Sequence, residues 1–282
     1  SKVAPVDRLV GTNDVGMVGW SCVLKTPEFP AGRPLVIVAN DCTFQSGSFG
    51  VREDDVFMKV SEYARAHGYP RVHIASNSGA RIGLADEVKP LVNVAWKDAA
   101  NPAAGYEYLY LSEPDYATLP AGTVLADKLT VGGEARYRLD AVIGKLHGIG
   151  VENLRGSGMI AGETSRAYED IFTLSYVTGR SVGIGAYLNR LGQRVIQKDE
   201  GPMILTGYSA LNKLLGRDVY SSQDQLGGPQ IMLPNGIAHM GVPNDQAGME
   251  AVVRWLSYTP ETVHHFALSL IHISEPTRLG MI

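Results

Sequence analysis

PLVIVAND (34–41) and RVHIA (71–75) are two short, near-continuous apolar runs, and with the segment between them they decide the fold. That segment, EDDVFMKVSEYARAHG (53–68), has apolar residues at the spacing of one helix face and is followed by Pro70. The order strand, helix, strand predicts a βαβ unit with a buried parallel strand pair. The chain is therefore expected to be an α/β protein.

The same alternation continues in the second half of the chain. We predict strands at 173–179, 194–197 and 202–207, and helices at 184–193, 209–216 and 245–259. A helix is also predicted from GARIGLADEV (79–88), and a glycine-bearing loop that runs into a helix is predicted for 153–171. Residues 97–145 predict an insertion on the sheet, made of two exposed strands and a Pro/Gly-containing loop.

Composition excludes several classes of protein. The 282 residues carry a formal charge of −4 and no long block of one sign, so neither nucleic acid nor an anionic membrane is an expected partner. No apolar run is long enough to span a membrane, and the first residues lack a signal-peptide core. Cys22 and Cys42 are too few for a disulfide framework or a four-cysteine zinc site. A reducing compartment, the cytoplasm or a plastid, is expected.

The two ends of the chain suggest a fragment. The sequence begins without Met, which we interpret as a piece cut from something longer. Residues 267–282 have no clear period and resemble a translated cloning adapter, so we assign 1–266 to the native domain and 267–282 to a non-native tail.

Four glycine clusters are the candidate functional segments: SNSGARIG (76–83), GSGMIAGE (156–163), SVGIGAY (181–187) and QLGGPQIM (225–232). Each is also explained by turns that need a positive φ. In the first and third, however, the glycines are predicted between a strand and the start of a helix. Unpaired N–H groups and the helix dipole favour negative charge there. Two such clusters facing each other could hold an oxyanion.

Motifs for the common kinds of catalysis are missing. The sequence contains no G-x-x-x-x-G-K-[ST], no G-x-G-x-x-G and no H-E-x-x-H. His73 lies in an apolar strand and His239 follows NGIA, and both are interpreted as core or loop histidines. Amide clusters without side-chain catalysts indicate chemistry carried by a cofactor or substrate, with the protein stabilising an oxyanion.

Long segments of the chain resemble one family. SNSGARIGLADEV (76–88), the segment 152–197, the segment 204–232 and WLSYTP (255–260) are similar to the N-terminal half of the carboxyltransferase domain of eukaryotic multidomain acetyl-CoA carboxylases. The resemblance covers about residues 10–265. It implies a crotonase-type α/β fold, in which repeated β-β-α units build a curved sheet with helices around it. It also implies transfer of a carboxyl group from carboxybiotin to acetyl-CoA, giving malonyl-CoA for fatty acid synthesis.

The resemblance assigns roles to individual residues. Arg81 matches the arginine that contacts coenzyme A, and a surface ion pair with Asp86 or Glu87 is its structural alternative. Gly79 and Ala80 match one part of the amide environment that holds the enolate oxygen. Ile184 and Gly185 match another, for the thioester or for the biotin ureido oxygen. Gly227 and Gly228 are expected in the wall of the site, although ordinary turns explain them equally well.

The resemblance also implies partners. These are acetyl-CoA or malonyl-CoA, carboxybiotin carried by a separate biotin carboxyl carrier domain, the C-terminal carboxyltransferase half and a second copy in a homodimer. Bacterial counterparts carry a four-cysteine zinc ribbon that two cysteines cannot build, so no metal is expected. Because the C-terminal half is missing, this half is expected to be inactive alone.

Two alternatives remain open. The chain could be another crotonase-class acyl-CoA enzyme, with Glu163 or Glu169 as its carboxylate. It could also be an inactive half that binds only coenzyme A or a partner chain, exposing an apolar face through which it self-associates.

Overall fold

The computed structural model describes residues 3–9, 11–81, 84–144 and 154–263. Within these residues the chain divides into two compact units. The larger unit holds 3–9, 11–48, 56–79 and 159–263, and the smaller unit holds 49–55, 80–81, 84–144 and 154–158. The tail 267–282 lies outside the described residues.

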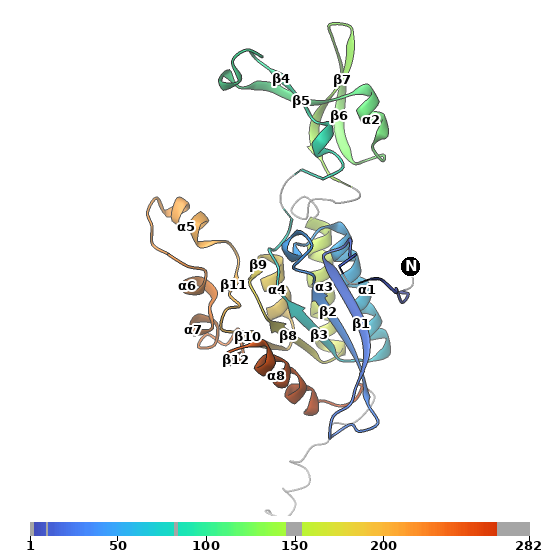
Figure 1. The fold of residues 1–282 in the computed structure, drawn as a ribbon, viewed down its shortest axis with the longest axis vertical. Coiled ribbons are helices and arrows are strands. Elements are labelled where there is room, and N and C mark those ends of the chain that lie inside the picture. The colour runs from blue at the N-terminus through green and yellow to red at the C-terminus, as the bar shows by residue number, and fades with distance from the viewer. Residues whose placement is uncertain (1–2, 10, 82–83, 145–153, 264–282) are drawn as a thin grey trace, which may run out of the picture. The chain divides into compact units, whose positions relative to one another are not determined.

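A six-stranded sheet forms the centre of the larger unit (Figure 1), in the order β1-β2-β3-β8-β10-β12. β1 pairs antiparallel with β2, and each of the other neighbouring strands is parallel. The strands are β1 (Met17–Leu24), β2 (Arg33–Asn40), β3 (Arg71–Ala75), β8 (Thr173–Val177), β10 (Arg194–Lys198) and β12 (Met240–Val242). The predicted βαβ unit is present as β2, α1 (Val51–His67) and β3.

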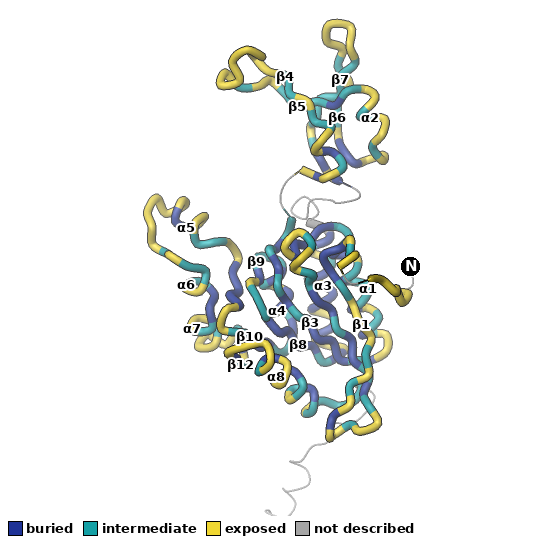
Figure 2. The backbone as a smooth tube through the Cα atoms, in the orientation of Figure 1, coloured by how far each residue is buried: buried dark blue, intermediate teal, exposed yellow. Residues whose placement is uncertain are grey.

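Helices cover both faces of this sheet because its strands present apolar residues on both sides. Val36 of β2 packs with Ala64 of α1 and Ala167 of α3 (Leu154–Asp170). Its neighbour Leu35 faces the other way, into a cluster with Val252 of α8 (Asp245–Ser257). Figure 2 shows buried backbone along the inner strands β3 and β8, whereas β1 at the edge of the sheet is largely exposed. The near-continuous apolar runs that identified these strands follow from this double burial.

The larger unit also contains a short pair of parallel strands, β9 (Ser181–Val182) and β11 (Met203–Ile204). The helices of this part are α4 (Ile184–Leu191), α5 (Tyr208–Leu215), α6 (Asp224–Gly227) and α7 (Pro229–Met232). Short helical turns are η1 (Gln45–Gly47), η2 (Lys89–Leu91) and η3 (Pro102–Ala104), the last two of them in the smaller unit.

The smaller unit is an antiparallel sheet with its own core. Its order is β4-β5-β7-β6, formed by β4 (Asn93–Trp96), β5 (Tyr106–Ser112), β6 (Val124–Val131) and β7 (Glu134–Val142), with α2 (Glu113–Thr118) after β5. Leu111, Val124 and Val142 are buried together with Ala85 and Val88. The prediction of two exposed strands was wrong, since four strands with a core of their own form a separate unit.

Two local predictions were also wrong. After β3 the described residues 84–88 form turns rather than a helix, because the chain leaves the larger unit here and Ala80 pairs with Phe49 instead. GSGMIAGE is not a loop, since α3 already begins at Leu154. Gly158 and Gly162 are therefore helical, and the buried residues Ile160, Thr164 and Ala167 outweigh the helix cost of these glycines, about 1 kcal/mol each. In the described residues no helix is long and apolar enough to cross a membrane.

Candidate functional site

Two of the predicted glycine clusters meet in the larger unit, and Asn77 joins them. Asn77 follows β3 and is 2% exposed. Its Oδ1 accepts the N–H groups of Gly79 and Val182, each at 3.1 Å. Its Nδ2 donates to Ser181 Oγ at 3.0 Å. The loop after β3 is thereby fixed against the strand that leads into α4.

Glycine is needed at two positions for this contact. Gly79 has φ +79°, and a Cβ on it would lie 2.9 Å from the Val182 carbonyl oxygen. A Cβ on Gly185 would overlap the Asn77 side chain. The main chains of the two loops can therefore approach only because both residues lack a side chain.

The amides of the two loops are not equally available. The Gly79 N–H is already given to Asn77 Oδ1. In contrast, α4 begins after Gly183, which has no side chain to cap it. The N–H groups of Ile184 and Gly185 are in the first turn, where no intrahelical acceptor exists. This helix start is suited to binding an oxyanion or a carbonyl oxygen.

Ala80 and Arg81 belong to the smaller unit and are held by the start of α1. Ala80 forms an isolated parallel bridge with Phe49, and the Arg81 N–H donates to the Phe49 carbonyl at 2.7 Å. Arg81 Nη2 lies 3.1 Å from Glu53 Oε1, and the two side chains are 11% and 2% exposed. Arg81 thus forms an ion pair with Glu53, whereas the sequence had suggested Asp86 or Glu87 as its partner. Its contact with coenzyme A stays a prediction.

Asp54, next to this pair, is an unusual buried carboxyl. The residue is 1% exposed, and within the described structure neither carboxyl oxygen has a hydrogen-bond partner. Burial, and secondly the negative charge of Glu53, raise the pKa of Asp54 to about 7, while Arg81 opposes the shift. Asp54 therefore exchanges its proton near neutral pH.

The glycine cluster QLGGPQIM (225–232) lies against the short parallel pair of β9 and β11. A Cβ on Gly227 would overlap the Met203 carbonyl oxygen, and Gln197 Nε2 donates to the Gly227 carbonyl at 2.8 Å. Met203 and Ile204 form β11, which pairs with β9. The Gly228 N–H donates to the Asp224 carbonyl at 2.9 Å. A place for Gly227 and Gly228 in a ligand-binding wall stays a prediction.

Arg180 is a residue of this region that the sequence analysis missed. It is exposed, its carbonyl accepts the Asn77 N–H at 2.7 Å, and its Nη2 donates to Ser78 Oγ at 3.1 Å. Among the described residues no acidic partner lies within ion-pair distance of it. Its position just after a buried strand, in VTGRS, was the available signal. Arg180 is a cation that an anionic ligand could reach.

Of the four side chains considered for general acid–base catalysis, His73 and Glu163 are buried in the core, whereas His239 and Glu169 are exposed. His73 is 1% exposed, and burial, then Arg71, lower its pKa to about 3. Nδ1 of His239 accepts the Val195 N–H at 3.0 Å. Glu163 is fully buried, accepts the Ser61 hydroxyl at 2.8 Å and lies 3.3 Å from Arg65 Nε. Glu169 is exposed on α3.

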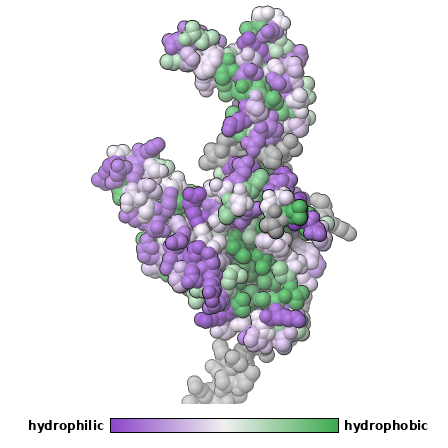
Figure 3. Space-filling view, viewed as in Figure 1, coloured by the Kyte–Doolittle hydropathy of each residue, from purple (hydrophilic) through white to green (hydrophobic). Residues whose placement is uncertain are grey.

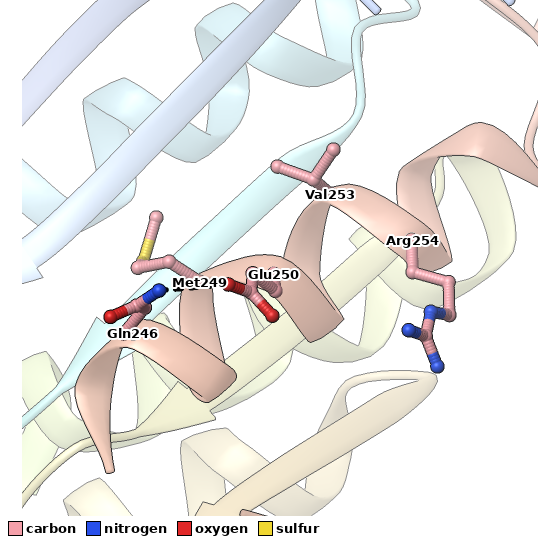
Figure 4. A pocket seen from close by; sticks show the side chains of 5 residues that line it. All are labelled: Gln246, Met249, Glu250, Val253 and Arg254. Atoms are coloured by element: carbon pink, nitrogen blue, oxygen red, sulfur yellow. Dashed lines mark hydrogen bonds between the residues drawn. The ribbon is translucent and has the colours of Figure 1, made fainter.

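No metal-binding group or pocket of the described residues includes the predicted site residues. The described residues contain no group of three or more His, Cys, Asp or Glu side chains that could hold a metal ion. A shallow surface pocket of about 480 Å³ lies on the exposed side of α8 (Figure 4), where Met249 and Val253 point one way and Arg254 another. Its lining contains none of the predicted site residues.

Residues 27–277 match the family model described as the carboxyl transferase domain. The chain therefore belongs to the carboxyl transferase domain family. It is 54% identical over 263 residues to the acetyl-CoA carboxylase of Saccharomyces cerevisiae, covering 92% of this chain and 12% of that protein. It is 55% identical over 261 residues to acetyl-CoA carboxylase 2 of Oryza sativa subsp. japonica, covering 92% of this chain and 11% of that protein. The chain thus spans about an eighth of the length of these relatives.

A solved structure of similar fold is the transcarboxylase 12S with hydrolysed methylmalonyl-coenzyme A bound, at a TM-score of 0.59 and 17% identity. The match covers 89% of this chain and 35% of that one. The prediction of a crotonase-type α/β fold is confirmed, as is the resemblance to the acetyl-CoA carboxylases. The comparisons give no support for another crotonase-class enzyme, and Glu163 of α3 is fully buried and hydrogen-bonded to Ser61 of α1.

Proposed function

We propose that this chain is the N-terminal half of a biotin-dependent carboxyltransferase that forms malonyl-CoA from acetyl-CoA. The observation that carries this proposal is the Asn77 bridge, which fixes the loop after β3 against the uncapped start of α4. Main-chain donors held in this way need no reorganisation when charge develops on a substrate oxygen. The 54% identity to an acetyl-CoA carboxylase supports the choice of substrate.

The chain's own groups would then act through hydrogen bonds. On the loop after β3 we assign the donor role to the Ala80 N–H, because the Gly79 N–H is given to Asn77. It would polarise the thioester carbonyl and hold the enolate oxygen once the acetyl carbon loses its proton. In comparable sites, loss of one such donor costs about 2.7–4 kcal/mol of barrier.

The start of α4 fits the ureido group of biotin, since the first-turn N–H groups of Ile184 and Gly185 suit a carbonyl oxygen. These two residues would hold and orient that group, and carboxybiotin, when bound, supplies the carboxyl group. A separate biotin carboxyl carrier domain would deliver it. Arg81 would contact coenzyme A, and Gly227 and Gly228 would form part of the wall.

The rest of the site would come from other chains or segments. We assign it to the C-terminal carboxyltransferase half, within a homodimer in the cytosol or a plastid, and we propose that residues 267–282 are not part of the native domain. Exposed apolar side chains on the larger unit fit a partner surface, among them Trp20 and Val23 of β1, 49% and 69% exposed. Figure 3 shows hydrophobic surface on this unit. Large exposed apolar areas commonly mark protein interfaces.

The test uses residues 1–266, the separate C-terminal half of a homologous domain, and their mixture. Decarboxylation of malonyl-CoA with free biotin is expected from the mixture and from neither half alone. The reason is that about 7–11 kcal/mol of acceleration depends on fixing both reactants. Activity of this half alone would overturn the half-site model. A silent mixture of two folded halves that still bind coenzyme A would favour the binding-only alternative.

A further inference from the structure

Glu53 connects two structural elements through its two carboxylate oxygens. Oε2 accepts the Gly50 N–H at 3.0 Å, and Oε1 pairs with Arg81 Nη2 at 3.1 Å. Glu53 is the third residue of α1, so its bond to Gly50 is the backward half of a capping box. One side chain therefore both starts the helix and holds the arginine.

The main chain is tied at the same place. Phe49 pairs with Ala80, and its carbonyl accepts the Arg81 N–H at 2.7 Å. Residues 80 and 81 are thus held from two directions by the segment 49–53, through a backbone bond and through an ion pair. Both contacts lie inside the smaller unit.

The local charges make this ion pair sensitive to substitution. Glu53 and Asp54 are each 1% exposed, and Arg81 is the cation paired with Glu53. Arg81 also lowers, and Glu53 raises, the pKa of Asp54, so the three charges act on one another. Removing the Glu53 charge leaves a nearly buried guanidinium without this carboxylate, and a buried charge that loses its partner drives rearrangement.

We infer that Glu53 is a positioning residue of the candidate site, which fixes the direction of the Arg81 side chain and of the Ala80 N–H. This inference rests on the proposed function for its effect on ligand binding. The effect of Glu53 on the local structure does not depend on the proposed function. Glu53 itself touches no substrate in this scheme and acts through Arg81.

The experiment compares Glu53→Gln, Arg81→Ala and the double variant with wild type. Glutamine keeps an oxygen that can accept the Gly50 N–H, so the variant removes the charge and spares the helix start. Glu62→Gln is the matched control, because it makes the same change at an exposed position of α1. Two quantities are measured on each protein: amide hydrogen exchange in residues 76–81 against the rest of the chain, and the affinity for coenzyme A by calorimetry.

Glu53→Gln is expected to speed exchange of the Arg81 amide, which donates to the Phe49 carbonyl, by about tenfold or more, with the amides of β8 unchanged. Affinity for coenzyme A should fall about tenfold, and for Arg81→Ala about 10- to 100-fold. The double variant should bind no more weakly than Arg81→Ala, because Glu53 acts through Arg81. Glu62→Gln should match wild type in both measurements.

Unchanged exchange of the Arg81 amide in Glu53→Gln would overturn the inference, whatever happens to binding. So would additive losses of affinity in the double variant. Two other results would contradict the proposed function without contradicting this inference. One is faster exchange with wild-type affinity in every variant, and the other is a wild type that does not bind coenzyme A. Either would leave Glu53 as the positioning residue of this loop but show that the loop does not bind coenzyme A.

Discussion

Replacing Asp54 by asparagine should make the protein more stable, and increasingly so as the pH rises. The side chain is 1% exposed and neither oxygen has a hydrogen-bond partner in the described structure. Its ordinary pKa of 3.8 is raised to about 7 in the folded protein. Between about pH 4 and pH 7 the folded state keeps a proton that the unfolded chain releases, so the wild-type free energy of unfolding falls through this window.

The size of the effect follows from the same values. A rise from 3.8 to about 7 corresponds to at most about 4 kcal/mol, taking about 1.4 kcal/mol for each pKa unit. Asparagine has nearly the same shape and no charge to bury. The stability of Asp54→Asn relative to wild type should therefore grow by up to about 4 kcal/mol from pH 4 to pH 8, and stay level above the folded pKa.

Urea unfolding followed by circular dichroism, at about pH 4 and about pH 8, measures this difference. Asp218→Asn is the control, because it makes the same substitution at an exposed position. A stability difference between Asp54→Asn and wild type that is the same at both pH values would refute the reasoning. It would mean that the carboxylate is solvated or paired in solution.

Three further substitutions test the candidate site. Asn77→Ala should lower the free energy of unfolding by about 1–3 kcal/mol for each N–H left unpaired, whereas Ser78→Ala, at a more exposed neighbour, should lower it little in the same assay. Equal losses of stability in the two variants would contradict the bridging role of Asn77. Gly227→Ala should destabilise by about 1–3 kcal/mol, because its methyl group meets the Met203 carbonyl, whereas Gly162→Ala has open space and should not; the reverse order would contradict this packing. Arg180→Ala should weaken malonyl-CoA binding in calorimetry at an unchanged thermal midpoint, and unaltered affinity would exclude Arg180 as an anion ligand.

The elements that were predictable from the sequence are those whose pattern is local. RVHIA is β3 residue for residue, and the helix predicted over 53–68 is observed as α1, Val51–His67. The spacing of the apolar residues, together with Pro70 between the helix and the strand, is enough to predict both elements without information from the rest of the chain. The start of α3 was missed because glycines at 156, 158 and 162 suggest a loop, while the packing that outweighs them comes from distant strands.

The candidate site was only partly predictable for the same reason. Glycine spacing led to Gly79 and Gly185, but both loops depend on Asn77, whose partners Val182 and Ser181 are more than 100 residues away in sequence. Nothing near Asn77 distinguishes it from a turn residue. Likewise the pairing of Arg81 with Glu53 joins two segments that share no local pattern.

The order of strands in the large sheet has a consequence for synthesis of the chain. β3 lies between β2 and β8, and His73 faces Ser175 in the register. All four strands of the antiparallel sheet of the smaller unit are encoded between these two strands. At about 5–20 residues per second, a ribosome needs roughly 5–20 s to cover that distance. During this time the edge of β3 that later pairs with β8 is unpaired. The antiparallel sheet is therefore synthesised before the large sheet can be completed. In this interval a chaperone or a non-native strand can bind to the unpaired edge of β3.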